Sequence, residues 1–161
     1  MTLAPYRLAI CALVAGLMLP AVSNARATTE TSDCFDVLVS ARPVEQIPTA
    51  IPECDDCIVM SWPWILDLDI EQVIKGHAPG DRLKVLNVQH TYLRADRWGR
   101  WWLRRNTLGV FNALRPEEGT TPRRCPKGTP PARPFVSPGD GQTLDDLERE
   151  SERLFGRHAT P

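Results

Sequence analysis

Apolar and polar residues alternate with a period of two along much of the chain. The clearest alternation is in residues 65–71, ILDLDIE, where apolar and acidic side chains take turns. This pattern is typical of a strand with one buried and one solvated face. A turn rich in glycine and proline follows at residues 76–80, and the alternation then resumes in RLKVLNVQH. Residues 67–90 are therefore predicted to form a β-hairpin.

Further strands are predicted on both sides of this hairpin. FDVLVSARPVEQ, which begins at Phe35, is rich in residues that favour strands, and Pro43 is expected at a bend or an edge because it has no N–H to donate. RWWLRRN and LGVFNALRP, within residues 100–116, are expected to form another strand pair. Four or five short strands without intervening helices predict a mainly β fold, either a small antiparallel barrel or a sandwich.

One helix is predicted after the strands, over LDDLERESERLF at residues 144–155. Thr143 precedes this segment as a suitable N-cap, and Gly156 follows it as a suitable end. The side chains expected on one face of the helix, and so against the barrel, are Leu144, Leu147, Ser151 and Leu154.

The amino-terminal residues have the form of a secretory signal peptide. Arg7 supplies a positive charge, residues 8–19 form an apolar run of 12 residues, and Ala25–Ala27 has the small-x-small form of a cleavage site. The run is shorter than the roughly 20 residues that cross a bilayer as a helix. We expect cleavage before Thr28, a periplasmic or secreted product, and no transmembrane segment in the mature chain.

Three segments follow from these predictions. Residues 1–27 are the signal peptide, and residues 28–138 form the barrel domain. The late part of that domain, residues 117–138, is rich in proline and glycine and is expected to be an irregular surface loop held down by Cys125. Residues 139–161 are the C-terminal helix and tail.

Charge is segregated along the domain. Residues 28–81 contain 11 Asp and Glu against Arg42 and Lys75, whereas residues 82–133 contain 12 Lys and Arg against three acidic residues. Two interpretations fit this pattern. The two segments pack together and pair their charges, or the basic segment forms a surface for an anionic partner.

The ECDDC segment places Cys54 and Cys57 three positions apart. A redox pair needs a stabilised thiolate, which the intervening Asp55 and Asp56 oppose. The four residues fit a β-turn whose end Cα atoms lie within roughly 7 Å, close enough for a disulfide. We therefore predict a disulfide between Cys54 and Cys57.

The cysteines that remain in the mature chain are Cys34 and Cys125, and an even number of cysteines in an exported protein favours disulfides. A bond between these two is predicted, although four cysteines allow two other pairings. A zinc site would have to combine isolated ligands, with His77 or His90 among them, and no metal is expected.

Leu68–Val88 resembles the netrin-like, or tissue-inhibitor-of-metalloproteinase-like, family. The match is the step at Val73–Gly76 with Val85 and Val88 after it. This resemblance implies an exported, disulfide-bonded OB-like barrel of about five strands with a helix packed on it. The metalloproteinase inhibitors of that family chelate zinc through an amino-terminal cysteine, and cleavage before Thr28 leaves further residues ahead of Cys34. That mechanism is therefore not expected here.

Arginine and tryptophan are interleaved in YLRADRWGRWWLRRN, residues 92–106. Both residue types are common at binding hot spots, and arginine pairs with anions. The candidate binding residues are Arg100, Arg104, Arg105, Trp98, Trp101 and Trp102. The alternative interpretation is that the tryptophans fill the barrel and the arginines cover its outer surface.

Signals of catalysis are sparse. His77, His90 and His158 occur without a nucleophile elbow or a phosphate-binding loop. His90 with Asp96 is a candidate acid–base pair, but a solvent-facing histidine at a strand end is the favoured interpretation. We expect no cofactor, and an interaction module of the cell envelope that binds an anionic protein, glycan or lipid head group rather than nucleic acid. The alternatives are a thiol-disulfide oxidoreductase that uses Cys54 and Cys57, and a structural envelope component.

Overall fold

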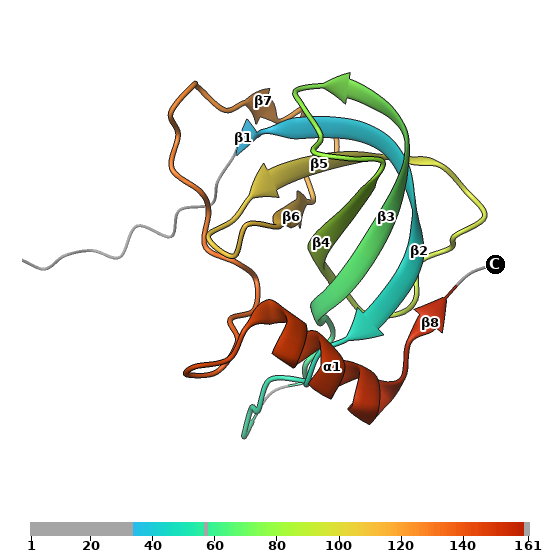
Figure 1. The fold of residues 1–161 in the computed structure, drawn as a ribbon, viewed down its shortest axis with the longest axis vertical. Helices are drawn as coiled ribbons and strands as arrows, with labels where there is room; N and C mark the ends of the chain where they lie inside the picture. Colours follow the sequence, from blue (N-terminus) through green and yellow to red (C-terminus); the bar gives the residue numbers. More distant parts are fainter. Residues whose placement is uncertain (1–33, 57, 160–161) are drawn as a thin grey trace, which may run out of the picture.

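The computed structural model describes residues 34–56 and 58–159. The predicted signal peptide, its cleavage site before Thr28, and Cys57 lie outside the described residues. Within them the chain forms a closed five-stranded barrel followed by a helix (Figure 1). The elements are β1 Cys34–Phe35, β2 Val37–Pro48, β3 Trp62–Lys75, β4 Arg82–Gln89, β5 Gly99–Arg105, β6 Phe111–Leu114, β7 Arg123–Arg124, α1 Leu144–Phe155 and β8 His158–Ala159.

The order of strands around the barrel is β2, β3, β4, β6, β5 and back to β2. This Greek-key order is that of an OB-like barrel and confirms the predicted fold class. One pairing, β4 with β6, is parallel, whereas the others in the barrel are antiparallel. A closed ring of five strands cannot alternate direction throughout, so the expected antiparallel barrel must contain one parallel pair.

The barrel core is built from the period-two pattern of β3 and β4. Trp64, Leu66 and Leu68 lie on the same face of β3 and pack with Leu83 and Val85 of β4, whereas Ile65 is buried on the opposite face. The predicted hairpin is confirmed, and β3 begins earlier than expected, at Trp62.

Strand β2 bends at the predicted proline. The register between β2 and β3 shifts between Pro43 and Glu45, as in a β-bulge. Before the bulge β2 pairs with β5, and after it Glu45 and Gln46 pair with β8 instead. The bend therefore allows one long strand to complete the barrel and to receive the C-terminal strand.

Helix α1 covers a second apolar cluster on the outside of the barrel. Ile47, Ile65 and Leu86 are buried there, with Leu144 and Leu147 of the helix packed against them. Thr143 forms the predicted N-cap in a capping box with Asp146, and Gly156 is the C-cap. The predicted helix face is wrong at its last member, because Leu154 is 51% exposed beyond the edge of this cluster.

Buried amide side chains fix the loop of residues 90–98 between β4 and β5. Gln89 donates a hydrogen bond to Gln46 over 3.2 Å. Gln46 in turn accepts one from the Leu93 N–H and donates one to the Leu93 carbonyl, each over 2.8 Å. These bonds fix the loop at Leu93, within the segment that leads to Trp98 and the start of β5.

Candidate functional site

The residues of the arginine-tryptophan stretch lie in different environments at the start of β5 and along it. Strand alternation directs Trp101 and Leu103 toward the barrel core, against which both pack. Arg100, Trp102 and Arg104 therefore take the outer face of β5. The stretch does not form one continuous patch, and each predicted residue has its own role.

Arg104 is buried, with 2% of its surface exposed, which contradicts the predicted exposed position. Its Nη1 donates to both carboxylate oxygens of Asp36, over 2.8 and 2.7 Å, and its Nη2 donates to the Pro130 carbonyl. The backbone N–H of Arg105 also donates to Asp36, over 2.7 Å. The late loop, residues 117–138, folds back over β5 and covers Arg104. Arg104 therefore has a structural role and is not available to a partner.

The side chain of Arg105 is exposed, as predicted, and its Cζ lies 4.9 Å from the centre of the Phe111 ring. Phe111 belongs to the barrel core. Arg105 therefore covers the core at the end of β5 through a cation–π contact, which fits the alternative interpretation in which arginines cover the barrel.

Neither Trp101 nor Trp102 exposes its whole ring for binding. Trp101 is partly buried against the core and donates from Nε1 to the Ala41 carbonyl over 3.0 Å. Trp102 is half-buried on the outer face, opposite Leu38 and Leu114 in the neighbouring strands. Trp101 fits the alternative interpretation, in which the tryptophans fill the barrel, whereas Trp102 covers the outer face of β5.

Trp98 and Arg100 remain at the surface, at the start of β5. Trp98 is 43% exposed, and the Cζ of Arg42 lies 5.0 Å from the centre of its ring. Arg97 and Arg100 on either side are exposed. We call Arg42, Arg97, Trp98 and Arg100 the Arg-Trp surface.

Sequence reasoning missed Arg42, because it precedes Trp98 by more than fifty positions and sits in an acidic segment. Only the register brings them together: Ala41 of β2 pairs with Gly99, and Ser40 pairs with Arg100. The sequence predicts pairs of strands that follow one another in the chain, and it does not predict that β2 lies beside β5.

Two arginines of the Arg-Trp surface, Arg97 and Arg100, keep positive charge without a nearby carboxylate in the described residues. Arg42 is the exception, because its Nη2 donates to an oxygen of Asp69 over 3.4 Å in a partly buried ion pair. In the described part of the chain, no carboxylate oxygen lies within 4.0 Å of the guanidinium groups of Arg97 or Arg100.

The nearby acid Asp96 is engaged by another arginine. Arg94 donates to both of its oxygens, over 3.0 and 2.6 Å. This hydrogen bonding lowers the pKa of Asp96 and raises that of Arg94. Asp96 is therefore not poised as an acid–base partner for His90, which is exposed.

The two oppositely charged segments are joined by little ion pairing. Among residues 34–56 and 58–159, the pair of Arg104 with Asp36 is the single ion pair within 4.0 Å that links residues 82–133 to residues 34–81. Charge pairing between the segments therefore does not account for most of the basic residues, which are exposed.

The disulfide between Cys34 and Cys125 is present, with an S–S distance of 2.10 Å. It joins Cys34 of β1 to the residue that follows β7, and β1 and β7 pair in parallel. Both cysteines are thereby excluded as thiolate ligands, and the described residues contain no group of three or more His, Cys, Asp or Glu able to hold a metal ion. The predicted bond from Cys54 to Cys57 involves a residue outside the described range.

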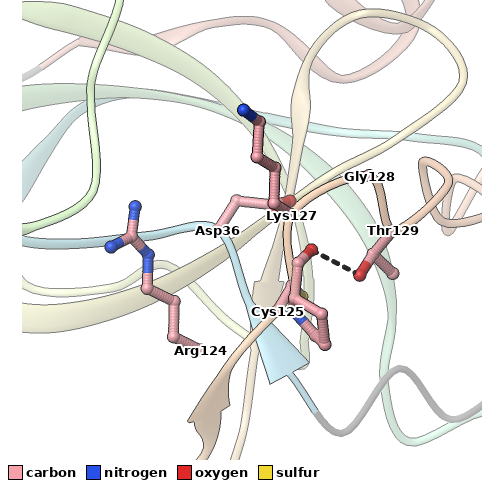
Figure 2. A pocket seen from close by; sticks show the side chains of 7 residues that line it. Asp36, Arg124, Cys125, Lys127, Gly128 and Thr129 are labelled. Atoms are coloured by element: carbon pink, nitrogen blue, oxygen red, sulfur yellow. Dashed lines mark hydrogen bonds between the residues drawn. The ribbon is translucent and has the colours of Figure 1, made fainter.

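A pocket of about 410 Å³ lies beside this disulfide (Figure 2). It is lined by Asp36, Arg124, Cys125, Pro126, Lys127, Gly128 and Thr129. Sequence reasoning did not single out Arg124 or Lys127. Their joint position depends on the late loop, which has no periodic pattern.

The comparisons with known proteins give no relatives. No protein-family model matches the chain, and no curated protein or solved structure matches it either. The resemblance to the netrin-like family therefore stays a prediction. Over the described residues, no helix has the length and apolar character needed to span a membrane.

Proposed function

We propose that this protein is an exported, disulfide-stabilised binding module of the cell envelope or the cell exterior, and that it contacts an anionic partner through the Arg-Trp surface. The observation that carries this proposal is the exposed ring of Trp98 beneath Arg42, beside Arg97 and Arg100, which have no carboxylate within 4.0 Å in the described structure.

The chemistry of this surface favours an anionic group. The guanidinium groups of Arg97 and Arg100, which have no carboxylate within 4.0 Å in the described structure, offer N–H donors that suit carboxylate, sulfate or phosphate oxygens. Tryptophan and arginine together are also the residue types most enriched at binding hot spots. An acidic protein segment, a polyanionic glycan and a lipid head group all present such oxygens.

The scaffold suits a rigid recognition surface outside the cytoplasm. The Cys34–Cys125 bond spans 91 positions of sequence. Long-range disulfides persist in oxidising compartments and restrict the unfolded chain. The buried amides of Gln46 and Gln89 hold the loop that leads into Trp98. A surface ordered before binding loses less conformational entropy when the partner arrives.

Binding to three immobilised probes tests the proposal: a sulfated polysaccharide, poly(glutamate), and vesicles that contain an anionic phospholipid. We expect at least one probe to bind with an affinity that falls as salt rises, because exposed charges are screened over roughly 8 Å at physiological ionic strength. The double variant Arg97→Ala, Arg100→Ala should bind that probe about tenfold more weakly.

The matched control is Arg133→Ala with Arg153→Ala, which removes the same charge from exposed positions elsewhere. This control should retain most of the affinity if the position of the charge matters. Equal loss in both double variants, or no binding of any probe at low salt, would contradict the proposed surface.

A further inference from the structure

The pocket beside the Cys34–Cys125 disulfide lies at the opposite end of β5 from the Arg-Trp surface. β1 and β7 meet near the carboxyl end of β5, whereas the loop of residues 90–98 enters its amino end (Figure 1). Neither Arg124 nor Lys127 belongs to the Arg-Trp surface. The pocket is therefore a separate candidate site, with no residue in common with the Arg-Trp surface.

The wall of the pocket is held by a covalent bond and by hydrogen bonds within the chain. Cys125 is bonded to Cys34, and its N–H donates to the Phe35 carbonyl over 2.8 Å. The following turn is closed by the N–H and the hydroxyl of Thr129, which donate to the Pro126 carbonyl over 3.2 and 2.7 Å (Figure 2). Gly128 has a φ of 85°, a conformation that glycine adopts readily.

The acidic residue in the pocket lining is already neutralised. Both oxygens of Asp36 accept hydrogen bonds from Arg104, and one also accepts the N–H of Arg105. Arg104 lies behind Asp36 with its side chain 3% exposed, so its charge is fixed in the protein. The Asp36 carboxylate is therefore poorly placed to pair with the two cations of the lining.

Arg124 and Lys127 supply the unpaired charge. Within the described structure, neither has a carboxylate oxygen within 4.0 Å. Figure 2 shows their side chains flanking Asp36 on the same side of the turn. Arg104 already pairs with the Asp36 carboxylate, so the two further cations of the lining leave a local excess of positive charge. This local excess of positive charge favours an anion and opposes a metal cation.

We propose that this pocket binds an oxyanion, a phosphate or sulfate group, between Arg124 and Lys127. Arginine offers a fork of donors to two oxygens, and lysine offers a compact charge to a third. The volume of about 410 Å³ exceeds that of the group itself and lies in the range of small-molecule sites. There is room for a phosphate or sulfate ester as well as for the free ion.

The test is a titration of the full, disulfide-bonded chain. Binding is monitored through the backbone amide NMR signals of Gly128 and Thr129. The titrants are inorganic phosphate, inorganic sulfate and glycerol phosphate, each at constant ionic strength set with chloride. A saturable shift of these two signals is expected with at least one titrant. Tighter binding of the ester than of the free ions identifies an esterified ligand, and the reverse identifies the free anion.

The double variant Arg124→Ala, Lys127→Ala should weaken binding at least about tenfold, because two charge-assisted hydrogen-bonding partners are lost. The matched control is Arg123→Ala with Arg133→Ala, which removes two exposed charges outside the pocket lining. It should leave the affinity within about twofold, well short of the tenfold step expected above. Mass measurement under non-reducing conditions verifies the disulfide in each variant.

Two results would overturn this inference. One is that none of the three titrants produces a saturable shift of the Gly128 and Thr129 NMR signals when it replaces chloride at constant ionic strength. The other is an equal loss of affinity in the pocket variant and its control, which would show a diffuse charge effect and no site.

Discussion

Arg100 and Arg104 lie on the same outer face of β5, yet one is exposed and the other is buried. The difference comes from Asp36 and the Pro130 carbonyl, which reach Arg104 from segments 68 and 26 positions away in sequence. A buried guanidinium requires a compensating charge, because desolvation of an unpaired ion is costly. Asp36 provides that charge and joins the start of β2 to the end of β5.

Replacement of Asp36 by Ala should therefore destabilise the fold strongly. Arg104 would stay buried without its counter-ion, and the expected loss is about 3 kcal/mol, at the low end for a broken buried pair because Asp36 is partly solvated. Urea unfolding monitored by tryptophan fluorescence measures this loss. The control Asp96→Ala breaks the exposed pair with Arg94 and should change stability little. Similar midpoints for wild type and Asp36→Ala would contradict the structural role of Arg104.

The elements that sequence predicted well are those whose pattern is local. The alternation in residues 65–71 and the cap at Thr143 are each contained within one element, and β3 and α1 form as expected. The candidate site was predicted only in part, because burial of Arg104 depends on the late loop and the role of Arg42 depends on strand register. No periodic signal within β5 distinguishes Arg100 from Arg104.

The N-terminal cap of α1 leads to a prediction about pH. The N–H and the hydroxyl of Thr143 donate to the Asp146 carboxylate over 2.8 and 2.6 Å. With the help of Arg149, they lower the pKa of Asp146 from 3.8 to about 2. A carboxyl group with a lowered pKa stabilises the folded state above its ordinary pKa, and this stabilisation is lost as pH falls through the lowered value. The contribution of the cap should therefore disappear between about pH 4 and pH 2.

Urea unfolding over this pH range checks the prediction in wild type and in Asp146→Asn. The variant should be less stable at neutral pH and should show a shallower loss of stability on acidification. The control Asp145→Asn alters the neighbouring exposed carboxyl in the same helical turn. If Asp146→Asn and Asp145→Asn had identical pH profiles, the cap would not be the source of the effect.

Across the whole molecule, the disulfide is the longest-range covalent link that the structure describes. It fixes β1 to the late loop, and that loop in turn covers Arg104 and forms the pocket. The barrel strands do not need this link to pair with one another. Loss of the bond should thus affect the pocket more than the Arg-Trp surface.

The variant Cys34→Ser, Cys125→Ser should lose stability by up to about 4.6 kcal/mol on the chain-entropy estimate for this separation. If Cys54 and Cys57 are joined as predicted, their removal should cost only about 1.9 kcal/mol, because the closed loop is short. Calorimetric unfolding of both variants checks the order. Probe binding by the Arg-Trp surface should persist in the folded Cys34→Ser, Cys125→Ser protein, and its loss would contradict the independence of the two ends of β5.

If the chain is exported amino end first, the two cysteines of the Cys34–Cys125 bond reach the oxidising compartment at different times. Cys34 reaches the oxidising compartment 91 positions ahead of Cys125. The nascent thiols of Cys54 and Cys57 arrive in the interval, so the oxidant meets a wrong partner for Cys34 before the right one. Such a bond is corrected only by thiol–disulfide exchange. Maturation is therefore expected to require an isomerase as well as an oxidase, and the supply of that helper would limit the yield of folded protein.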